Sequence, residues 1–338
     1  MESQEKKNKI RFRPNPGLKL MAQVREVLRY HHYAYRTEQT YCQWILRYIR
    51  HFGGKTHPNR LGAQDVERFL SHLATEGQVS ASTQRQALNA LVFLYREVLD
   101  KPFTEIAPVR SKRKQRPPTV LTQPEVLKLL VAMTGKHALM AKILYGGGLR
   151  LLECLRLRVQ DVDFGQKIIF VRGGKGGKDR TTILPQNLWE DLQAQITAVK
   201  TLHLRELEEG FGEVYLPDAL ARKYPNAMRK AGWQWVFPAK DRSVDPRSGK
   251  TMRHHVIESG LQKAVARATQ HAGIDKKIGC HTLRHSFATH MLENGTNIRI
   301  LQELLGHADV KTTEIYTHVM ARDIRQLQSP LDRLLNKV

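Results

Sequence analysis

The chain has 338 residues, 41% of them hydrophobic, which is long enough for two domains that each bury a core. Lys and Arg outnumber Asp and Glu by 55 to 32, and the resulting formal net charge of +23 favours a polyanionic partner. Three widely spaced cysteines argue against a disulfide framework, and no apolar run approaches the length of a membrane span. We therefore expect a cytoplasmic protein.

The first third of the chain predicts a helical domain behind a short leader. Residues 1–16 are charged and lack an apolar core, so we expect a flexible leader and not a signal peptide. Residues 17–108 show helical periodicity and no convincing strand, which predicts a four-helix unit beginning near Leu18. Its apolar faces include Ile45 and Tyr48, Phe69 and Leu73, and Leu91 and Leu94.

Residues 109–118 are polar, basic and closed by two prolines, which predicts an extended linker. Four basic residues in this linker are candidate phosphate contacts: Lys112, Arg113, Lys114 and Arg116. Basic residues outnumber acidic ones by 22 to 10 in residues 1–118 and by 33 to 22 in residues 119–338. Because both halves are cationic, a clamp around a duplex is favoured over a single basic arm.

Residues 119–338 predict a second domain that is mainly helical with a small sheet. It begins with a capping-box pattern over 122–125. Three glycines at 146–148 permit a tight turn, after which a helical pattern resumes and places Arg150 and Glu153 three positions apart. Taken alone, that pair could also be an exposed ion pair.

A β-hairpin is predicted next, because apolar and β-branched residues at 167–171 and 181–184 flank a glycine-rich turn. Lys175 lies at its tip. A nucleotide-binding P-loop is disfavoured, since Asp179 stands where that motif requires Ser or Thr. A lysine at such a tip can instead protonate a leaving oxygen.

The most informative spacing is that of His281, Arg284, His307 and Tyr316. Periodicity over 282–293 predicts a helix with His281 at its start, and Gly306 predicts a helix end that presents His307 at a corner. Arginine can engage two phosphate oxygens, whereas a phenol of pKa about 10 attacks well only if its proton is accepted. His281 and His307 are the candidate acceptors. The pattern indicates phosphate chemistry carried out by a tyrosine without a metal.

Six of these residues carry a family resemblance: Arg150, Lys175, His281, Arg284, His307 and Tyr316. In order and spacing they resemble the active-site set of the tyrosine recombinases, the lambda-integrase family, across nearly the whole chain. The resemblance implies a SAM-like core-binding domain at 17–108 and a mixed α+β catalytic domain at 119–338. It also implies a DNA substrate and no cofactor, neither ATP nor a divalent metal.

The same resemblance implies a role for each site residue. Arg150, Arg284 and His307 would hold the scissile phosphate, and Glu153 matches the acidic support residue. Lys175 would be the general acid for the 5′-hydroxyl leaving group. His281 would assist proton transfer, and Tyr316 would form a 3′-phosphotyrosyl link.

A longer segment between the hairpin and His281, about 213–253, resembles the additional segment of integron integrases. That subfamily recombines gene cassettes at a duplex attI site and an attC site folded from a single strand. Flat side chains in and beside the segment are candidates for stacking on unpaired bases: Tyr224, Trp233, Trp235, His254 and His255. The alternative for the tryptophans is packing in the domain core. The apolar stripe in residues 320–338 would, by resemblance, dock on a neighbouring subunit within a four-subunit assembly on DNA.

Other classes remain open on the sequence. A metal-dependent nuclease would use His281 and His285, but the acidic cluster that two-metal chemistry needs is missing between Arg150 and the hairpin. A non-catalytic DNA-binding regulator is disfavoured by the full set of site residues. Within the family, the alternative is a Xer-like or phage-type enzyme that acts only on duplex sites.

Overall fold

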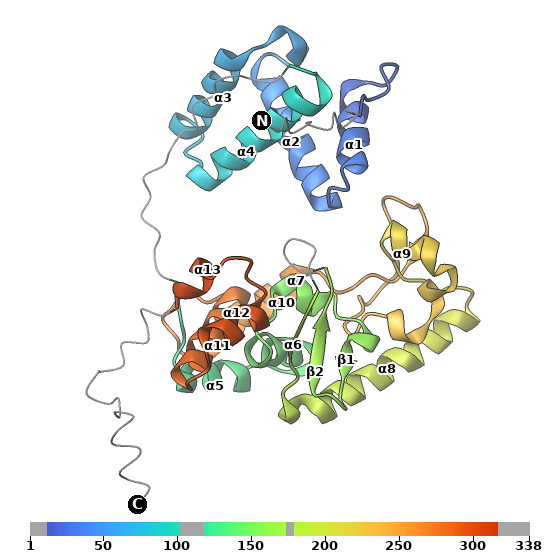
Figure 1. The fold of residues 1–338 in the computed structure, drawn as a ribbon, viewed down its shortest axis with the longest axis vertical. Helices are drawn as coiled ribbons and strands as arrows, with labels where there is room; N and C mark the ends of the chain where they lie inside the picture. Colours follow the sequence, from blue (N-terminus) through green and yellow to red (C-terminus); the bar gives the residue numbers. More distant parts are fainter. Residues whose placement is uncertain (1–11, 102–117, 174–178, 317–338) are drawn as a thin grey trace, which may run out of the picture. The chain divides into compact units, whose positions relative to one another are not determined.

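The computed structural model describes residues 12–101, 118–173 and 179–316. The chain divides into two compact units, residues 1–115 and 116–338, and each is described here by itself (Figure 1). Within the described residues no helix is long and apolar enough to cross a membrane. Both units are mainly helical, so the predicted fold class of helices with a small β-sheet is confirmed.

The first unit packs four helices around one apolar core. Their bounds are α1 Leu20–Tyr30, α2 Tyr35–His51, α3 Ala63–Thr75 and α4 Ala81–Phe93, with a π-helical turn Leu94–Val98 after α4. Tyr48 and Tyr95 are buried at its centre and share a hydrogen bond of 3.0 Å between their hydroxyls. The Tyr95 hydroxyl also lies 3.0 Å from the Pro58 carbonyl oxygen, so the one polar group of each buried ring is satisfied.

The second unit surrounds a small sheet with helices. Its helices are α5 Gln123–Val131, α6 Gly135–Gly146, α7 Leu151–Leu155, α8 Trp189–Glu208, α9 Asp218–Lys223, α10 Glu258–His271, α11 Cys280–Glu293, α12 Ile298–Leu305 and α13 Lys311–Glu314. The sheet joins β1 Val162–Asp163, β2 Ile168–Val171 and β3 Arg180–Ile183, all antiparallel. A separate two-stranded ribbon pairs β4 Ser243–Val244 with β5 Thr251–Met252.

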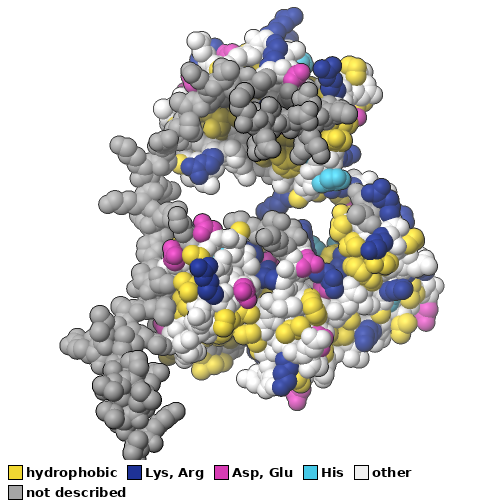
Figure 2. Space-filling view, in the orientation of Figure 1, with side chains coloured by type: hydrophobic (Ala, Val, Ile, Leu, Met, Phe, Trp, Pro, Cys, Tyr) yellow, Lys and Arg dark blue, Asp and Glu magenta, His cyan; other side chains and the backbone are white. Residues whose placement is uncertain are grey.

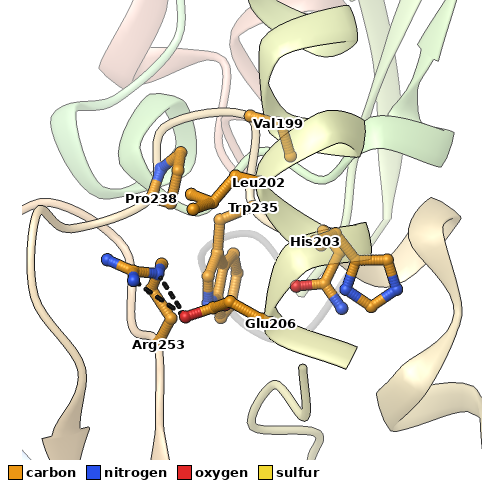
Figure 3. Close-up of a pocket in the computed structure, with 8 residues that line it drawn as sticks. Val199, Leu202, His203, Glu206, Trp235, Pro238 and Arg253 are labelled. Atoms are coloured by element: carbon orange, nitrogen blue, oxygen red, sulfur yellow. Dashed lines mark hydrogen bonds and ion pairs between the residues drawn. The ribbon is translucent and has the colours of Figure 1, made fainter. Parts of the chain in front are cut away.

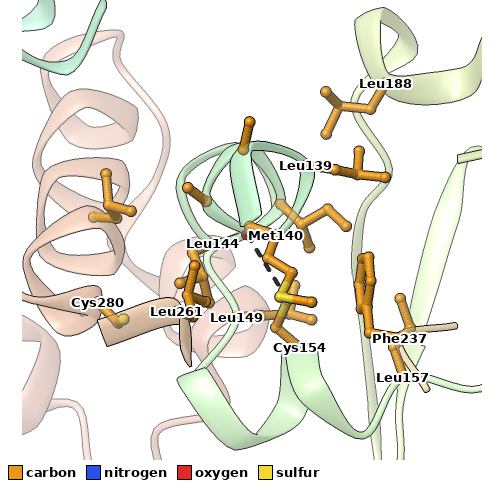
Figure 4. Close-up of a cluster of buried hydrophobic side chains, with 14 of the residues drawn as sticks. Leu139, Met140, Leu144, Leu149, Cys154, Leu157, Leu188, Phe237, Leu261 and Cys280 are labelled. Atoms are coloured by element: carbon orange, nitrogen blue, oxygen red, sulfur yellow. Dashed lines mark hydrogen bonds between the residues drawn. The ribbon is translucent and has the colours of Figure 1, made fainter. Parts of the chain in front are cut away.

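Helix α6 is the central element of the second core, because it packs against both α10 and α11. Its apolar residues surround the helix on every side, as expected for a buried helix. Figure 4 shows Leu139, Met140 and Leu144 of α6 meeting side chains from α7, α10 and the segment at Phe237. Because Phe237 belongs to the predicted insert at about 213–253 and is a member of this core, the insert is joined to the core.

Several local expectations are confirmed. The capping box at the start of α5 is present, with Thr122 and Glu125 each bonding the backbone of the other. The predicted hairpin forms, with Ile169 opposite Thr182 in its register. Gly306 ends α12 in the left-handed conformation, at φ 61°. This last feature turns the chain sharply toward Tyr316.

The glycine turn after α6 is required by space as well as by conformation. Gly148 has φ 63°, a value that costs other residues about 1–2 kcal/mol. A Cβ atom at this position would also collide with the ring of Phe287 on α11. The turn therefore lets α11 approach the chain immediately before Arg150.

We predict that Gly148→Ala destabilises the second unit by about 1–3 kcal/mol more than Gly273→Ala does, because only the first adds a steric collision. Gly273 is a matched control, since its φ is 62° and nothing lies within 4 Å of a Cβ placed there. Urea unfolding is followed by tryptophan fluorescence on a Trp44→Phe background. The signal then reports only the second unit, because the other three of the four tryptophans lie in that unit. Equal losses in the two variants would contradict the steric argument.

Candidate active site

The carboxylate of Glu153 organises a cluster of arginines. Arg150 is the N-cap residue of α7 and Glu153 is the third residue after it, so the Glu153 side chain bonds back to the start of its own helix. The carboxylate accepts hydrogen bonds from the Arg150 backbone N–H at 2.7 Å and from Arg150 Nη1 at 2.8 Å. Arg180 on β3 donates Nη1 and Nη2 to the same carboxylate at 2.8 and 2.7 Å. The bidentate pair ties the hairpin to the start of α7.

The charge of this cluster is strongly positive. Arg284 on α11 also approaches Glu153, with 3.8 Å between Nη1 and Oε2, so three guanidinium groups share one carboxylate. In the described part of the chain no other carboxylate pairs with any of them. Burial raises the pKa of Glu153, but hydrogen bonds and charge from Arg180 and then Arg150 lower it to about 2. The surplus of buried positive charge favours binding of an anion.

Arg284 is the most deeply placed of the three. Its side chain is 5% exposed, and it donates to the Gly148 carbonyl and, at 2.6 Å, to the Leu305 carbonyl. Burial, and then repulsion by Arg150, lower the pKa of Arg284 to about 9. A bound phosphate would offset both effects, because it supplies the negative charge that the cluster lacks.

His307 follows the left-handed residue Gly306 and contacts the same cluster. Its Nε2 lies 3.3 Å from Arg284 Nη2, and its Nδ1 lies 2.9 Å from the Thr313 hydroxyl oxygen. The Gly306 carbonyl accepts from Arg150 Nη2 at 3.3 Å. The corner predicted from the glycine is therefore present, and it brings His307 to the arginines.

Tyr316 lies just after α13, and its ring packs against α11 and α12. The residue is 1% exposed and belongs to a small apolar cluster with Phe287, Leu301 and Leu305. Burial raises the pKa of the Tyr316 phenol, while the charges of Arg284 and Arg150 act in the opposite direction. The phenol is thus held beside the arginine cluster.

The histidine that contacts this phenol is one that the sequence analysis missed. His285 Nδ1 lies 2.7 Å from the Tyr316 hydroxyl oxygen. His281 is exposed in the first turn of α11 and makes no hydrogen bond with Tyr316 among the described residues. His307 is engaged by Arg284 and Thr313. In this structure the phenol is therefore bonded by His285, and the roles expected of His281 and His307 stay predictions. His285 could have been found, since it lies four positions after His281 on the same helix.

Arg180 is the second residue that the sequence analysis did not single out. It begins β3, its side chain is 9% exposed, and its Nε donates to the Leu304 carbonyl at 2.9 Å. A Cβ atom on Gly306 would collide with its side chain. The available signal was weak, because an arginine after a glycine-rich turn is usually a solvated residue.

Several candidates lie outside the described residues. These are Lys175 at the hairpin tip and the linker residues Lys112, Arg113, Lys114 and Arg116. The strands that flank Lys175 are described, and the Gly173 N–H donates to Asp179 Oδ1 at 2.7 Å at the base of the turn. The hairpin that carries Lys175 is therefore anchored at Asp179 and, through Arg180, at Glu153.

The structure of the insert corrects the expectation that Trp235 stacks on an unpaired base. This residue is 6% exposed and lies against the guanidinium of Arg158, whose Cζ is 3.8 Å from the ring centroid. His255 packs edge-on against Trp235 at 5.3 Å, and His254 lies 3.8 Å from Asp245. Trp235 thus has the packing role left open as its alternative, because a buried ring presents no face to a base.

Other residues hold the insert on α8. Arg253 donates Nε and Nη2 to Glu206 Oε1 at 3.0 and 2.8 Å, as Figure 3 shows beside Trp235. Trp233 is partly buried, with Arg158 Cζ 5.4 Å from its ring centroid. Tyr224 is 47% exposed and remains available for stacking. On the visible face in Figure 2, hydrophobic and basic side chains lie side by side in the region of α9.

The described residues contain no group of three or more His, Cys, Asp or Glu that could hold a metal ion. The cluster itself consists of guanidinium groups, imidazoles and a phenol. Such groups bind an anionic phosphate and supply a nucleophile from the protein itself.

We predict that Glu153→Gln lowers the unfolding free energy by roughly 3 kcal/mol at pH 7, because the folded-state pKa is depressed from 4.5 to about 2. The carboxylate stabilises the folded chain above pH 4.5, and this contribution is lost as the pH falls toward 2. The wild-type and variant stabilities should therefore converge in acid. Asp191→Asn is the control, since it removes one partner of an exposed ion pair with Lys142. Parallel wild-type and Glu153→Gln curves between pH 4.5 and 2 would refute the prediction.

Comparisons with known proteins agree with this geometry. A family model described as the phage integrase family matches residues 119–322, and one described as the phage integrase N-terminal SAM-like domain matches residues 20–105. An integrase/recombinase of Escherichia coli is 48% identical over 324 residues, covering 95% of each chain. Tyrosine recombinase XerA of Thermococcus onnurineus is 33% identical over 296 residues, covering 86% of this chain and 88% of its own.

Two solved structures share the fold. A lambda integrase dimer bound to a COC' core site is 16% identical with a TM-score of 0.57, covering 91% of this chain and 98% of that chain. XerH bound to difH substrate in a pre-cleavage complex is 21% identical with a TM-score of 0.54, and the match covers 91% of this chain and 85% of that chain. The family model spans more than half of the chain, and the relatives align along most of it. The chain therefore belongs to the phage integrase family, the tyrosine recombinases.

Proposed function

We propose that this protein is an integron-type integrase, which inserts and excises gene cassettes by joining a duplex attI site to an attC site folded from one DNA strand. As a tyrosine recombinase it breaks and rejoins DNA. The observation that carries the chemical proposal is the surplus of guanidinium charge around Glu153, placed beside the phenol of Tyr316. A phosphodiester is the substrate group that this surplus suits best.

In the proposed reaction, Arg150, Arg284 and His307 bind the non-bridging oxygens of the scissile phosphate. Tyr316 attacks phosphorus and forms a 3′-phosphotyrosyl bond, while Lys175 protonates the departing 5′-oxygen. His281 is assigned to assist proton transfer. The bond energy is kept in the covalent intermediate, so neither ATP nor a metal is required. Rejoining is the reverse attack by a 5′-hydroxyl.

The integron assignment is supported by the insert at about 213–253. It is held on α8 by Arg253 and on the core by Arg158, so its exposed surface has a rigid base. Tyr224 on that surface is flanked by Lys223, whose Nζ lies 5.3 Å from the ring centroid. An exposed aromatic ring next to a cation suits an unpaired base and its phosphate. We assign to this region the recognition of bases that protrude from a folded strand.

The DNA partner is supported by related structures, in which lambda integrase and XerH are bound to their DNA sites. We assign residues 17–108 to core binding, residues 109–118 to a linker along the phosphates and residues 119–338 to catalysis. The segment 320–338 lies outside the described residues, and we propose that it joins subunits of a tetramer on DNA.

We predict that the purified protein, in excess chelator, forms a denaturant-resistant adduct with a labelled attC bottom strand and less with its top strand or the matched duplex. Tyr316→Phe should abolish the adduct while DNA binding persists, because only the nucleophilic oxygen is removed. Tyr145→Phe is the matched control, since Tyr145 is another tyrosine that hydrogen-bonds a histidine of α11.

Each outcome of this experiment tests a different part of the proposal. A Tyr316-dependent adduct on duplex DNA alone would retain the recombinase and replace the integron assignment with a Xer-like or phage-type one. An adduct that survives Tyr316→Phe would reject Tyr316 as the nucleophile. Loss of the adduct in chelator would reject the metal-independent reaction.

We predict that Lys175→Ala slows cleavage of ordinary DNA by about 100-fold or more, the usual contribution of a positioned general acid. A substrate with sulfur at the 5′-bridging position should restore the rate, because a thiolate leaves without being protonated. Lys178→Ala is the control, since it removes a neighbouring charge of the same glycine-rich turn. Equal impairment of Lys175→Ala on both substrates would remove Lys175 from this role.

A further inference from the structure

Tyr316 makes a direct hydrogen bond to His285, a residue without a role in the proposed reaction. The distance from His285 Nδ1 to the Tyr316 hydroxyl oxygen is 2.7 Å. The two rings are tilted by 49° with centroids 5.6 Å apart, so they meet edge to edge through the hydrogen bond and are not stacked. The phenol oxygen is therefore hydrogen-bonded to an imidazole nitrogen.

The protonation states make the phenol the donor. Burial, followed by the charges of His281 and Arg284, lowers the pKa of His285 to about 4, so the imidazole is neutral at pH 7. The phenol keeps its proton, because burial raises its pKa. Tyr316 O–H thus donates to Nδ1, and the imidazole hydrogen lies on Nε2. Within the described residues, Nε2 has no hydrogen-bond partner of its own.

The other histidines of the cluster do not occupy this position. His307 contacts Arg284 through Nε2 and Thr313 through Nδ1. His281 lies one helical turn before His285 and is exposed. Among the described side chains, His285 is consequently the base that touches the reacting oxygen.

We propose that His285 accepts the proton of Tyr316 when the tyrosine attacks DNA, and returns it when the tyrosine leaves. The proposal rests on the proposed function, in which Tyr316 is the nucleophile. In cleavage the Tyr316 O–H proton passes to Nδ1, the phenolate oxygen forms a bond to phosphorus, and the bond from phosphorus to the 5′-oxygen breaks as that oxygen takes a proton from Lys175. In rejoining, the 5′-hydroxyl attacks, and the departing phenolate takes back the proton from Nδ1.

Substrate binding strengthens this base. The positive groups that oppose protonation of His285 include Arg284 in the same cluster, and a bound phosphodiester adds a negative charge beside them. The imidazolium that forms is therefore more stable with DNA bound than without it. Because Tyr316 is 1% exposed, the phosphate reaches its oxygen only after the contacts around the ring adjust. Proton acceptance is thereby coupled to the presence of the substrate.

The test uses a DNA substrate on which the wild-type chain forms an adduct and Tyr316→Phe does not, so the proposed function is established first. We expect His285→Ala to slow adduct formation by about 100-fold or more at unchanged DNA affinity. Replacing Tyr316 with a ring-fluorinated tyrosine, whose phenol is more acidic, should reduce the deficit of His285→Ala to about 10-fold or less, since an acidic phenol depends less on a base.

His290→Ala is the matched control, because His290 Nδ1 contacts the Tyr145 hydroxyl at 2.9 Å on the same helix. The His290→Ala variant should form the adduct at a rate close to that of the wild type. His285→Gln, which can accept a hydrogen bond but not a proton, should remain as slow as His285→Ala.

Three results would overturn the proposal. Full activity in His285→Gln would assign His285 to positioning alone. An equal deficit of His285→Ala with both tyrosines would exclude proton acceptance. A faster reaction of His285→Ala than of the wild type would show that the contact restrains the phenol at rest.

Discussion

The carboxylate of Glu153 is the negative charge about which the second unit arranges its arginines. Arg150, Arg180 and Arg284 come from three separate segments, and without a shared anion their guanidinium groups would repel one another. Glu153 partly offsets this repulsion and leaves a positive surplus. The same interaction therefore stabilises the fold of the site and makes the site attractive to a phosphate.

Backbone carbonyls complete the support of these side chains. The carbonyls of Gly148, Leu304, Leu305 and Gly306 each accept from one of the arginines. All four carbonyls lie at a chain turn, after α6 or at the end of α12, where helical hydrogen bonding stops and carbonyl groups need other donors. The left-handed conformations of Gly148 and Gly306 thus determine where the arginines are held, and through them where His307 lies.

The insert packs on the second unit without entering the arginine cluster. Arg158 is buried between Trp233 and Trp235, and it donates to backbone carbonyls of the insert. Burial lowers the pKa of Arg158 to about 10, a sign of how completely the insert covers it. Tyr224 therefore remains on the exposed surface of the insert, whereas Trp235 is buried against Arg158.

The sequence by itself determined the class of the fold, the hairpin and the helix end at Gly306. It also singled out Arg150, Glu153, Arg284, His307 and Tyr316, which the structure brings together. These features depend on local rules: periodicity, capping and the conformational freedom of glycine, all of which act over a few residues. Only the tertiary structure decided that His285 contacts the phenol, that Arg180 forms an ion pair with Glu153 and that Trp235 is buried. Each of those outcomes joins segments far apart in the chain, and which side chain fills a shared space is set by packing that no local spacing encodes.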